Sequence, residues 1–146
     1  MKKIINEMKL RLPALSVNEA VCRAVISSFM AELDPTVEEL GDVRCAVSEA
    51  VTNCIVHAYK FIPDRHKCYV YISVRLYDNR EISVEISDTG CGIEDVELAK
   101  RPAFTTGGDE RSGMGFLVME SFADEVRVRS RLGQGTAVLL RKKLTP

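Results

Sequence analysis

The chain has 146 residues, of which 46% are hydrophobic and 28% are charged, with a formal net charge of −1. This length predicts one domain with a hydrophobic core, and the near-neutral charge argues against a general nucleic-acid or membrane-surface binder. The five cysteines form no C-x-x-C pair and fit no zinc pattern, so we interpret them as small apolar residues of a reducing, cytoplasmic protein.

The first part of the chain predicts one strand and two helices. Residues 8–12 alternate apolar and polar side chains, as a strand does. Ser16 with Glu19, and Thr36 with Glu39, have the spacing of capping boxes, which predicts that a helix begins after each pair. The first helix is expected to end near residue 33 and the second near residue 59.

The second part predicts four more strands and two more helices. β-Branched, aromatic or alternating residues indicate strands at 68–77, 81–87, 125–131 and 136–144, and helices are expected near 96–100 and at about 114–122. Most neighbouring strands are expected to run antiparallel. The order therefore predicts an α/β two-layer sandwich, in which a mixed, mostly antiparallel sheet carries helices on one face.

Eight of the nine glycines lie at or after Gly90, which concentrates close backbone contacts in the later part of the chain. Asp88, Gly90 and Gly92 directly follow a predicted strand. A carboxylate at a strand end can accept a hydrogen bond from a ligand amino group, and the glycines let the backbone approach that ligand. The alternative interpretation is an ordinary glycine turn.

Three further segments carry glycine pairs. Arg111, Gly113 and Gly115 precede a predicted helix, where backbone N–H groups and a planar cation favour an anion such as phosphate. Residues 104–109 have the composition of a mobile lid over a ligand, or of a plain surface loop. Residues 133–136, taken alone, indicate a hairpin turn.

The second predicted helix carries a polar stripe beside its apolar face. Glu49, Asn53 and His57 are spaced four residues apart and therefore project in the same direction. Asparagine is a poor helix former, so Asn53 between small apolar neighbours is harder to interpret as part of a solvated face. For Glu49 alone, a solvated helix face remains the alternative.

These motifs, in this order, resemble the GHKL superfamily of ATP-binding proteins. The resemblance rests on Glu49-x-x-x-Asn53, Asp88-x-Gly90-x-Gly92, Gly113-x-Gly115 and Gly133-x-Gly135-Thr136. Residues 32–35, 47–53, 104–106 and 110–116 more narrowly resemble the anti-sigma-F serine kinases of spore-forming bacteria. One departure is residues 107–109, where that family usually has a Lys-Pro and a slightly longer segment.

The resemblance implies a Bergerat-type ATP-binding fold, in which residues 1–146 form a single GHKL-type kinase domain. It implies that Glu49 is the general base, that Arg111 assists transfer, and that Asn53 holds Mg²⁺. The implied ATP or ADP contacts are Asn53, Asp88, Gly90, Gly92, Thr105, Thr106, Ser112, Gly113, Met114, Gly115 and Thr136.

The same resemblance implies a homodimer that binds and inhibits sporulation sigma factor F and phosphorylates a serine of an anti-anti-sigma factor. Arg23 is our candidate for a partner-binding residue. No direct contact with nucleic acid or membrane is expected, because the basic residues after 125 alternate along strands as a solvated face does. The alternatives are the related kinase that controls general-stress sigma factor B, an ATP-switched sigma-binding module, and a stand-alone ATPase.

Overall fold

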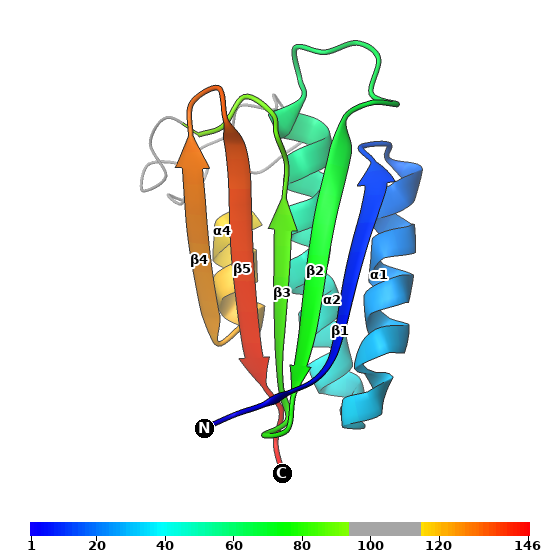
Figure 1. The fold of residues 1–146 in the computed structure, drawn as a ribbon, viewed down its shortest axis with the longest axis vertical. Helices are drawn as coiled ribbons and strands as arrows, with labels where there is room; N and C mark the ends of the chain where they lie inside the picture. The colour runs from blue at the N-terminus through cyan, green and yellow to red at the C-terminus, as the bar shows by residue number, and fades with distance from the viewer. Residues whose placement is uncertain (94–114) are drawn as a thin grey trace.

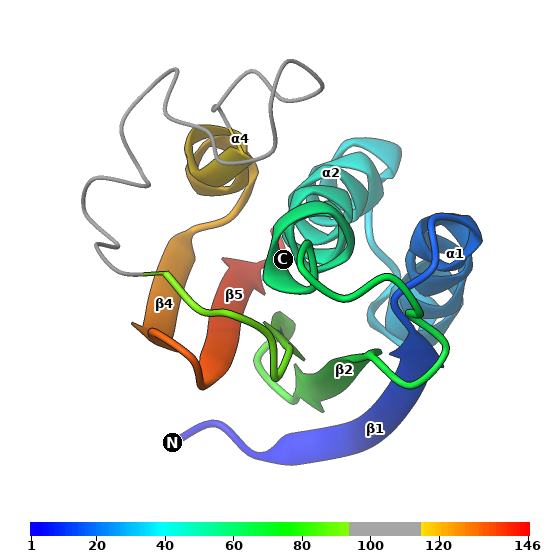
Figure 2. The same cartoon turned by 90° about the horizontal axis from the view of Figure 1, so that it is seen from above.

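The computed structural model describes residues 1–93 and 115–146. In this part, five antiparallel strands form one sheet in the order β1-β2-β3-β5-β4, and helices α1, α2 and α4 cover one face of it (Figure 1, Figure 2). The predicted two-layer sandwich with helices on one face is therefore confirmed, and the described strand pairs are all antiparallel, where a mixed sheet was predicted. The strands are β1 (Ile4–Pro13), β2 (Tyr69–Tyr77), β3 (Glu81–Ser87), β4 (Glu125–Arg131) and β5 (Gly135–Lys143).

The first two helices begin and end close to the predicted positions, but each changes from an α-helix to another helix type in its last turn. α1 (Val17–Met30) continues as a single 3-10 turn, Ala31–Leu33, and α2 (Val37–Asn53) continues as a π-helical segment, η2 (Cys54–Ala58). α4 (Gly115–Phe122) lies where the sequence predicts the last helix. The helix predicted at 96–100 lies outside the described residues. None of the described helices combines the length and the apolar character needed to cross a membrane.

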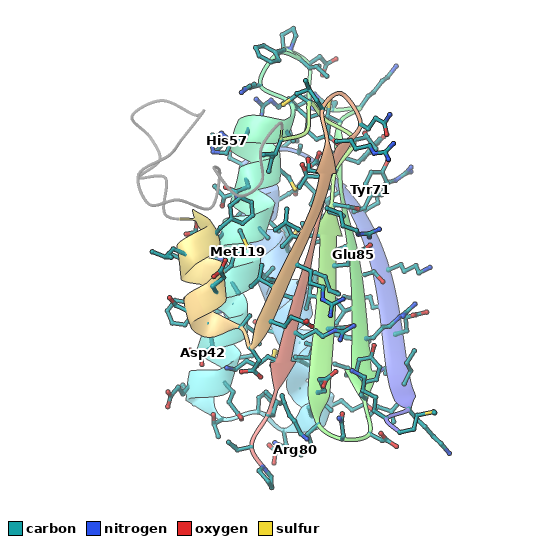
Figure 3. All side chains as sticks on the ribbon, turned by 90° about the vertical axis from the view of Figure 1, so that its left-hand side faces the viewer. Asp42, His57, Tyr71, Arg80, Glu85 and Met119 are labelled. Carbon is teal, nitrogen blue, oxygen red and sulfur yellow. The ribbon has the colours of Figure 1, made fainter. Side chains whose placement is uncertain are left out.

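The core lies between the helices and the inward-facing residues of the central strands. Val74 of β2 pairs in register with Val84 of β3, and both are almost completely buried under α2. Met119 of α4 is also fully buried, whereas Tyr71 and Glu85 lie on the opposite face of the sheet (Figure 3). This period-two division of side chains leaves one face for the helices and one polar face.

The two predicted capping boxes have different outcomes. At α2 the box is formed, because the Glu39 N–H donates to Thr36 Oγ1 at 3.1 Å and the Thr36 N–H donates to Glu39 Oε1 at 2.9 Å. At α1 the prediction is wrong, since Ser16 makes no side-chain cap. The Glu19 carboxylate instead lies 2.9 Å from Arg23 Nε and accepts a hydrogen bond from Ser48 of α2. A tertiary contact has replaced the local one.

Glu39 gives the fold a specific acid sensitivity. Its second oxygen accepts the Thr145 N–H at 2.7 Å, and backbone N–H donation from Thr36 and Thr145 lowers the pKa of Glu39 to about 2. Because the folded pKa is below the unfolded pKa of about 4.5, this stabilisation is present above that value and is lost as the pH falls toward 2. We therefore expect Glu39→Gln to unfold at lower urea concentration than the wild type at pH 7, and to lose less stability on acidification.

Glu38→Gln is the matched control, because Glu38 is the exposed neighbour in the same helical turn. Urea unfolding at several pH values between 7 and 3 measures both variants. An equal loss of stability on acidification in Glu39→Gln and in the wild type would contradict the assignment.

Candidate functional site

The polar stripe of α2 meets the first residue of α4. A Cβ atom placed on Gly115 would lie 3.4 Å from both side-chain polar atoms of Asn53 and 3.4 Å from Glu49 Oε2. Glu49 and Asn53 therefore point toward the N-terminal end of α4, as the resemblance implies. Because Gly115 has no side chain, the backbone at the start of α4 can lie directly against these two polar side chains.

The helix that carries this stripe widens directly after Asn53. Cys54–Ala58 is π-helical, a rare conformation that occurs as short segments often found at functional sites. His57 projects from this segment on the side of the helix that faces α4 (Figure 3). The upper end of the helix in Figure 1 lies beside the start of the glycine loop that follows β3 (residues 88–93), and this loop separates it from the β4–β5 turn.

Asp88 is a buried carboxylate at the end of β3. It is 8% exposed, and its Oδ1 accepts the Gly90 N–H at 3.0 Å and the Thr136 N–H at 3.2 Å. Burial raises the pKa of Asp88, while donation from Gly90, the Cys54 thiol and Thr136 opposes that rise. A buried carboxylate held by fixed donors has a defined direction, which is the property that ligand recognition needs.

The glycines around Asp88 are required by close contacts between segments far apart in the sequence. A Cβ atom on Gly90 would lie 2.1 Å from the Ala58 carbonyl oxygen, and one on Gly92 would lie 2.0 Å from the Arg131 oxygen. Gly135 has φ +91°, and its Cβ would lie 2.1 Å from the Asp88 oxygen. No other residue type fits these positions without displacement of the backbone.

Hydrogen bonds hold the loop on both sides. The Cys91 N–H donates to the Ala58 carbonyl at 2.8 Å, the Gly133 N–H donates to the Cys91 carbonyl at 2.6 Å, and the Ile93 N–H donates to Ser130 Oγ at 2.7 Å. The loop from Asp88 onward is thus fixed between η2 and the β4–β5 turn. Two glycine motifs that are separate in the sequence form one structural unit.

Gly90→Ala tests this close packing. We expect it to lower the free energy of unfolding by about 1–3 kcal/mol, because overpacking of a well-packed site costs this much. Gly41→Ala is the control, because Gly41 lies within α2 and a Cβ there meets nothing within 4 Å. Helix propensity predicts that this variant is more stable by up to about 1 kcal/mol. Urea unfolding measures both, and equal stability of the two variants would contradict the packing argument.

The remaining predicted residues divide into two groups. The predicted lid at 104–109 lies outside the described residues. So do the residues assigned to the phosphates other than Gly115, which are Thr105, Thr106, Arg111, Ser112, Gly113 and Met114. Arg23 lies on α1, on the opposite side of α2 from α4 (Figure 2), where it pairs with Glu19. It is therefore placed on the α1 side of the molecule, apart from the helix that adjoins Glu49 and Asn53.

The structure also adds residues that the sequence did not single out. Tyr59 and Ser130 both hydrogen-bond to the glycine loop, and Cys54 contacts the Asp88 carboxylate. A buried hydroxyl needs a partner, so a tyrosine at the end of an apolar helical face is a weak signal for such a role. Ser130 and Cys54 have no sequence signal, because their partners are brought to them by the fold.

The donor set fits a magnesium ion that is shared with a phosphate ligand. Asn53 and Glu49 offer hard oxygen atoms, the ligands that Mg²⁺ prefers, and both side chains face the start of α4 at Gly115. Among the described residues, no group of three or more His, Cys, Asp or Glu side chains converges on one point.

Comparison with known proteins gives consistent matches. Residues 12–142 match the family model of the histidine kinase-like ATPase domain. The chain is 48% identical over 141 residues to the anti-sigma F factor of Priestia megaterium, which covers 96% of this chain and 94% of that protein. It is 47% identical over 139 residues to the anti-sigma F factor of Clostridium acetobutylicum, with 94% of each chain covered.

Solved structures support the fold. A chain with the RsbU and RsbW domains from Mycobacterium tuberculosis matches with a TM-score of 0.68 at 18% identity, covering 95% of this chain and 32% of that one. A chain of the SiaB–SiaC complex from Pseudomonas aeruginosa matches with a TM-score of 0.63 at 12% identity, covering 95% of this chain and 89% of that one. At these identities the matches concern the architecture alone.

Proposed function

Since this chain belongs to the histidine kinase-like ATPase domain family and, within it, to the anti-sigma F factors, we propose that it is an ATP-dependent protein-serine kinase that also binds and inhibits a sigma factor. Its protein substrate is an anti-anti-sigma factor, and its cofactors are ATP and Mg²⁺. The domain match across residues 12–142 supports a single kinase domain.

The observation that carries the proposal is the meeting of Glu49, Asn53 and Gly115. It puts a carboxylate and an amide oxygen together at the start of a helix, where a transferred phosphoryl group would need a proton acceptor and a cation. We assign Glu49 as the general base and Asn53 as the residue that holds Mg²⁺. The ion supplies neutralisation of phosphate charge.

The second part of the proposed site is the glycine loop, which begins at Asp88. Because Oδ1 accepts both backbone N–H groups, we assign Oδ2 to the exocyclic amino group of adenine. Gly90 and Gly92 allow the backbone to lie against the base, and Thr136 supports Asp88 from β5. The residues assigned to the phosphates are Thr105, Thr106, Arg111, Ser112, Gly113, Met114 and Gly115.

The proposed reaction requires mainly that the serine hydroxyl and the γ-phosphoryl group be held in the correct orientation. The serine oxygen of the partner forms a bond to the γ-phosphorus as the bond to the leaving oxygen of ADP breaks. Glu49 accepts the proton of the serine hydroxyl, and Arg111 stabilises the charge that develops on the transferred group. Asp88 contributes by holding the base, so that the far end of the nucleotide reaches Glu49 in a fixed position.

The partner surfaces are proposed on β1 and α1. β1 is an edge strand whose Ile4 and Ile5 are 48% and 47% exposed, and an uncovered apolar edge suits a homodimer contact. Arg23 of α1 is assigned to partner binding, since its side chain is 37% exposed beside Glu19. The proposed partners are sigma factor F, the anti-anti-sigma factor and a second copy, in the cytoplasm and without direct nucleic-acid or membrane contact.

The test is transfer of labelled phosphate from ATP to the anti-anti-sigma factor, together with capture of sigma factor F in the presence of ATP or ADP. Phosphorylated partner and nucleotide-dependent capture are expected. Capture without transfer would favour an ATP-switched binding module, and phosphate release without an acceptor would favour a stand-alone ATPase. Parallel assays with the sigma B proteins decide between the two pathways.

A further inference from the structure

The hydroxyl group of Tyr59 connects three segments beside the glycine loop. Tyr59 follows η2 directly and is 2% exposed. Its hydroxyl donates to the Tyr69 carbonyl oxygen at 2.7 Å and accepts the Thr89 N–H at 2.9 Å. One oxygen atom therefore joins the end of the helix to the first residue of β2 and to the residue next to Asp88.

The bond to Thr89 acts on the peptide group that adjoins the Asp88 side chain. This peptide group consists of the Asp88 carbonyl and the Thr89 N–H. The Thr89 N–H is held by Tyr59, and on the other side of Asp88 its own N–H donates to the Thr136 carbonyl oxygen at 2.9 Å. Because the peptide groups on both sides of Asp88 are held, the backbone rotation that would swing its side chain is restricted.

We infer that Tyr59 is a positioning residue for nucleotide selectivity, whose hydroxyl holds the Asp88–Thr89 peptide group so that the Asp88 carboxylate is directed at the exocyclic amino group of adenine. This inference rests on the proposed role of Asp88. Burial raises the pKa of Tyr59, so its hydroxyl stays protonated and can donate throughout the neutral range.

The measurement is the ratio of affinities for ATP and inosine triphosphate. The two nucleotides share the ribose and the triphosphate and differ at the edge of the base that would face Asp88. A residue that only stabilises the fold would change both affinities by the same factor, whereas a residue that directs Asp88 changes their ratio. Tyr59→Phe retains the ring and removes the hydrogen bonds of the hydroxyl to Tyr69 and to Thr89, whose Oγ1 also lies 3.4 Å from it.

We expect the wild type to prefer ATP, and Tyr59→Phe to reduce that preference by about three- to tenfold, the value of a typical hydrogen bond. The loss should lie in ATP binding, with the affinity for inosine triphosphate within about twofold of wild type. Tyr77→Phe is the matched control, because Tyr77 is a buried tyrosine whose hydroxyl lies 3.4 Å from Ser83 Oγ within the sheet. It should keep the wild-type ratio.

A wild-type ratio in Tyr59→Phe would overturn the inference, whether both affinities are unchanged or fall together. If Asp88→Asn loses the preference for ATP while Tyr59→Phe keeps it, the inference alone fails. If the wild type shows no preference, or Asp88→Asn keeps it, the role proposed for Asp88 fails as well. Amide hydrogen exchange of Thr89 in the wild type provides a check that needs no variant: protection is expected, and rapid exchange overturns the inference.

Discussion

Glu49→Gln is expected to reduce phosphate transfer to the anti-anti-sigma factor by about 10²–10⁴-fold, the usual contribution of a general base. The amide has nearly the same shape as the carboxylate and the same place beside Asn53 and Gly115, but it cannot accept the serine proton. The affinity for ATP should stay close to wild type, since the contacts assigned to the adenine ring lie at Asp88. Single-turnover transfer of labelled phosphate and an equilibrium ATP titration measure the two effects separately.

Glu38→Gln is the control for this prediction, because it makes the same chemical change on the exposed first turn of α2. It should transfer phosphate at the wild-type rate. Full activity of Glu49→Gln would remove Glu49 as the base. A parallel loss of ATP affinity would instead show that the carboxylate supports nucleotide binding.

Asp88→Asn is expected to lower ATP affinity by about ten- to a hundredfold while the protein stays folded. This is the loss of affinity that corresponds to leaving one buried polar group without a hydrogen-bond partner. The asparagine oxygen can still accept the N–H groups of Gly90 and Thr136, which turns its NH₂ group toward the ligand. Two donors then face each other when adenine binds. Inosine triphosphate, which has a carbonyl oxygen in place of the amino group, should lose less affinity than ATP does.

The variant Asp64→Asn controls for the change in charge, because Asp64 is an exposed aspartate in the loop before β2. It should bind ATP as the wild type does. Circular dichroism melting curves establish that each variant is folded. Ordinary ATP affinity in Asp88→Asn would exclude Asp88 as the adenine ligand.

Local signals predicted the secondary structure where no distant residue competes for the same groups. Thr36 and Glu39 form their capping box because each satisfies the other's backbone N–H. Ser16 and Glu19 have the same spacing but form no box, since Arg23 and Ser48 engage the Glu19 carboxylate. Val37 is apolar and begins the second helix, yet it is 89% exposed at the first turn.

In the candidate site, too, local spacing predicted some features and distant contacts decided others. Spacing alone predicted that Glu49 and Asn53 project together, because four residues make about one helical turn. It did not predict that Gly115, more than sixty residues later, lies against both. Gly133 to Gly135 was the weakest of the glycine motifs, yet Gly135 is held against the Asp88 carbonyl as tightly as any glycine in the loop.

The sequence by itself determined the order of the described strands and helices, the helix that carries the polar stripe and the family, since these depend on periodicity and short motifs. Only the tertiary structure decided which loops touch: that η2 and the β4–β5 turn enclose the Asp88 loop, and that Tyr59 reaches Thr89. Glycine and tyrosine can occupy many environments. A contact between residues thirty or more positions apart depends on how helices pack on a sheet, which no local pattern encodes.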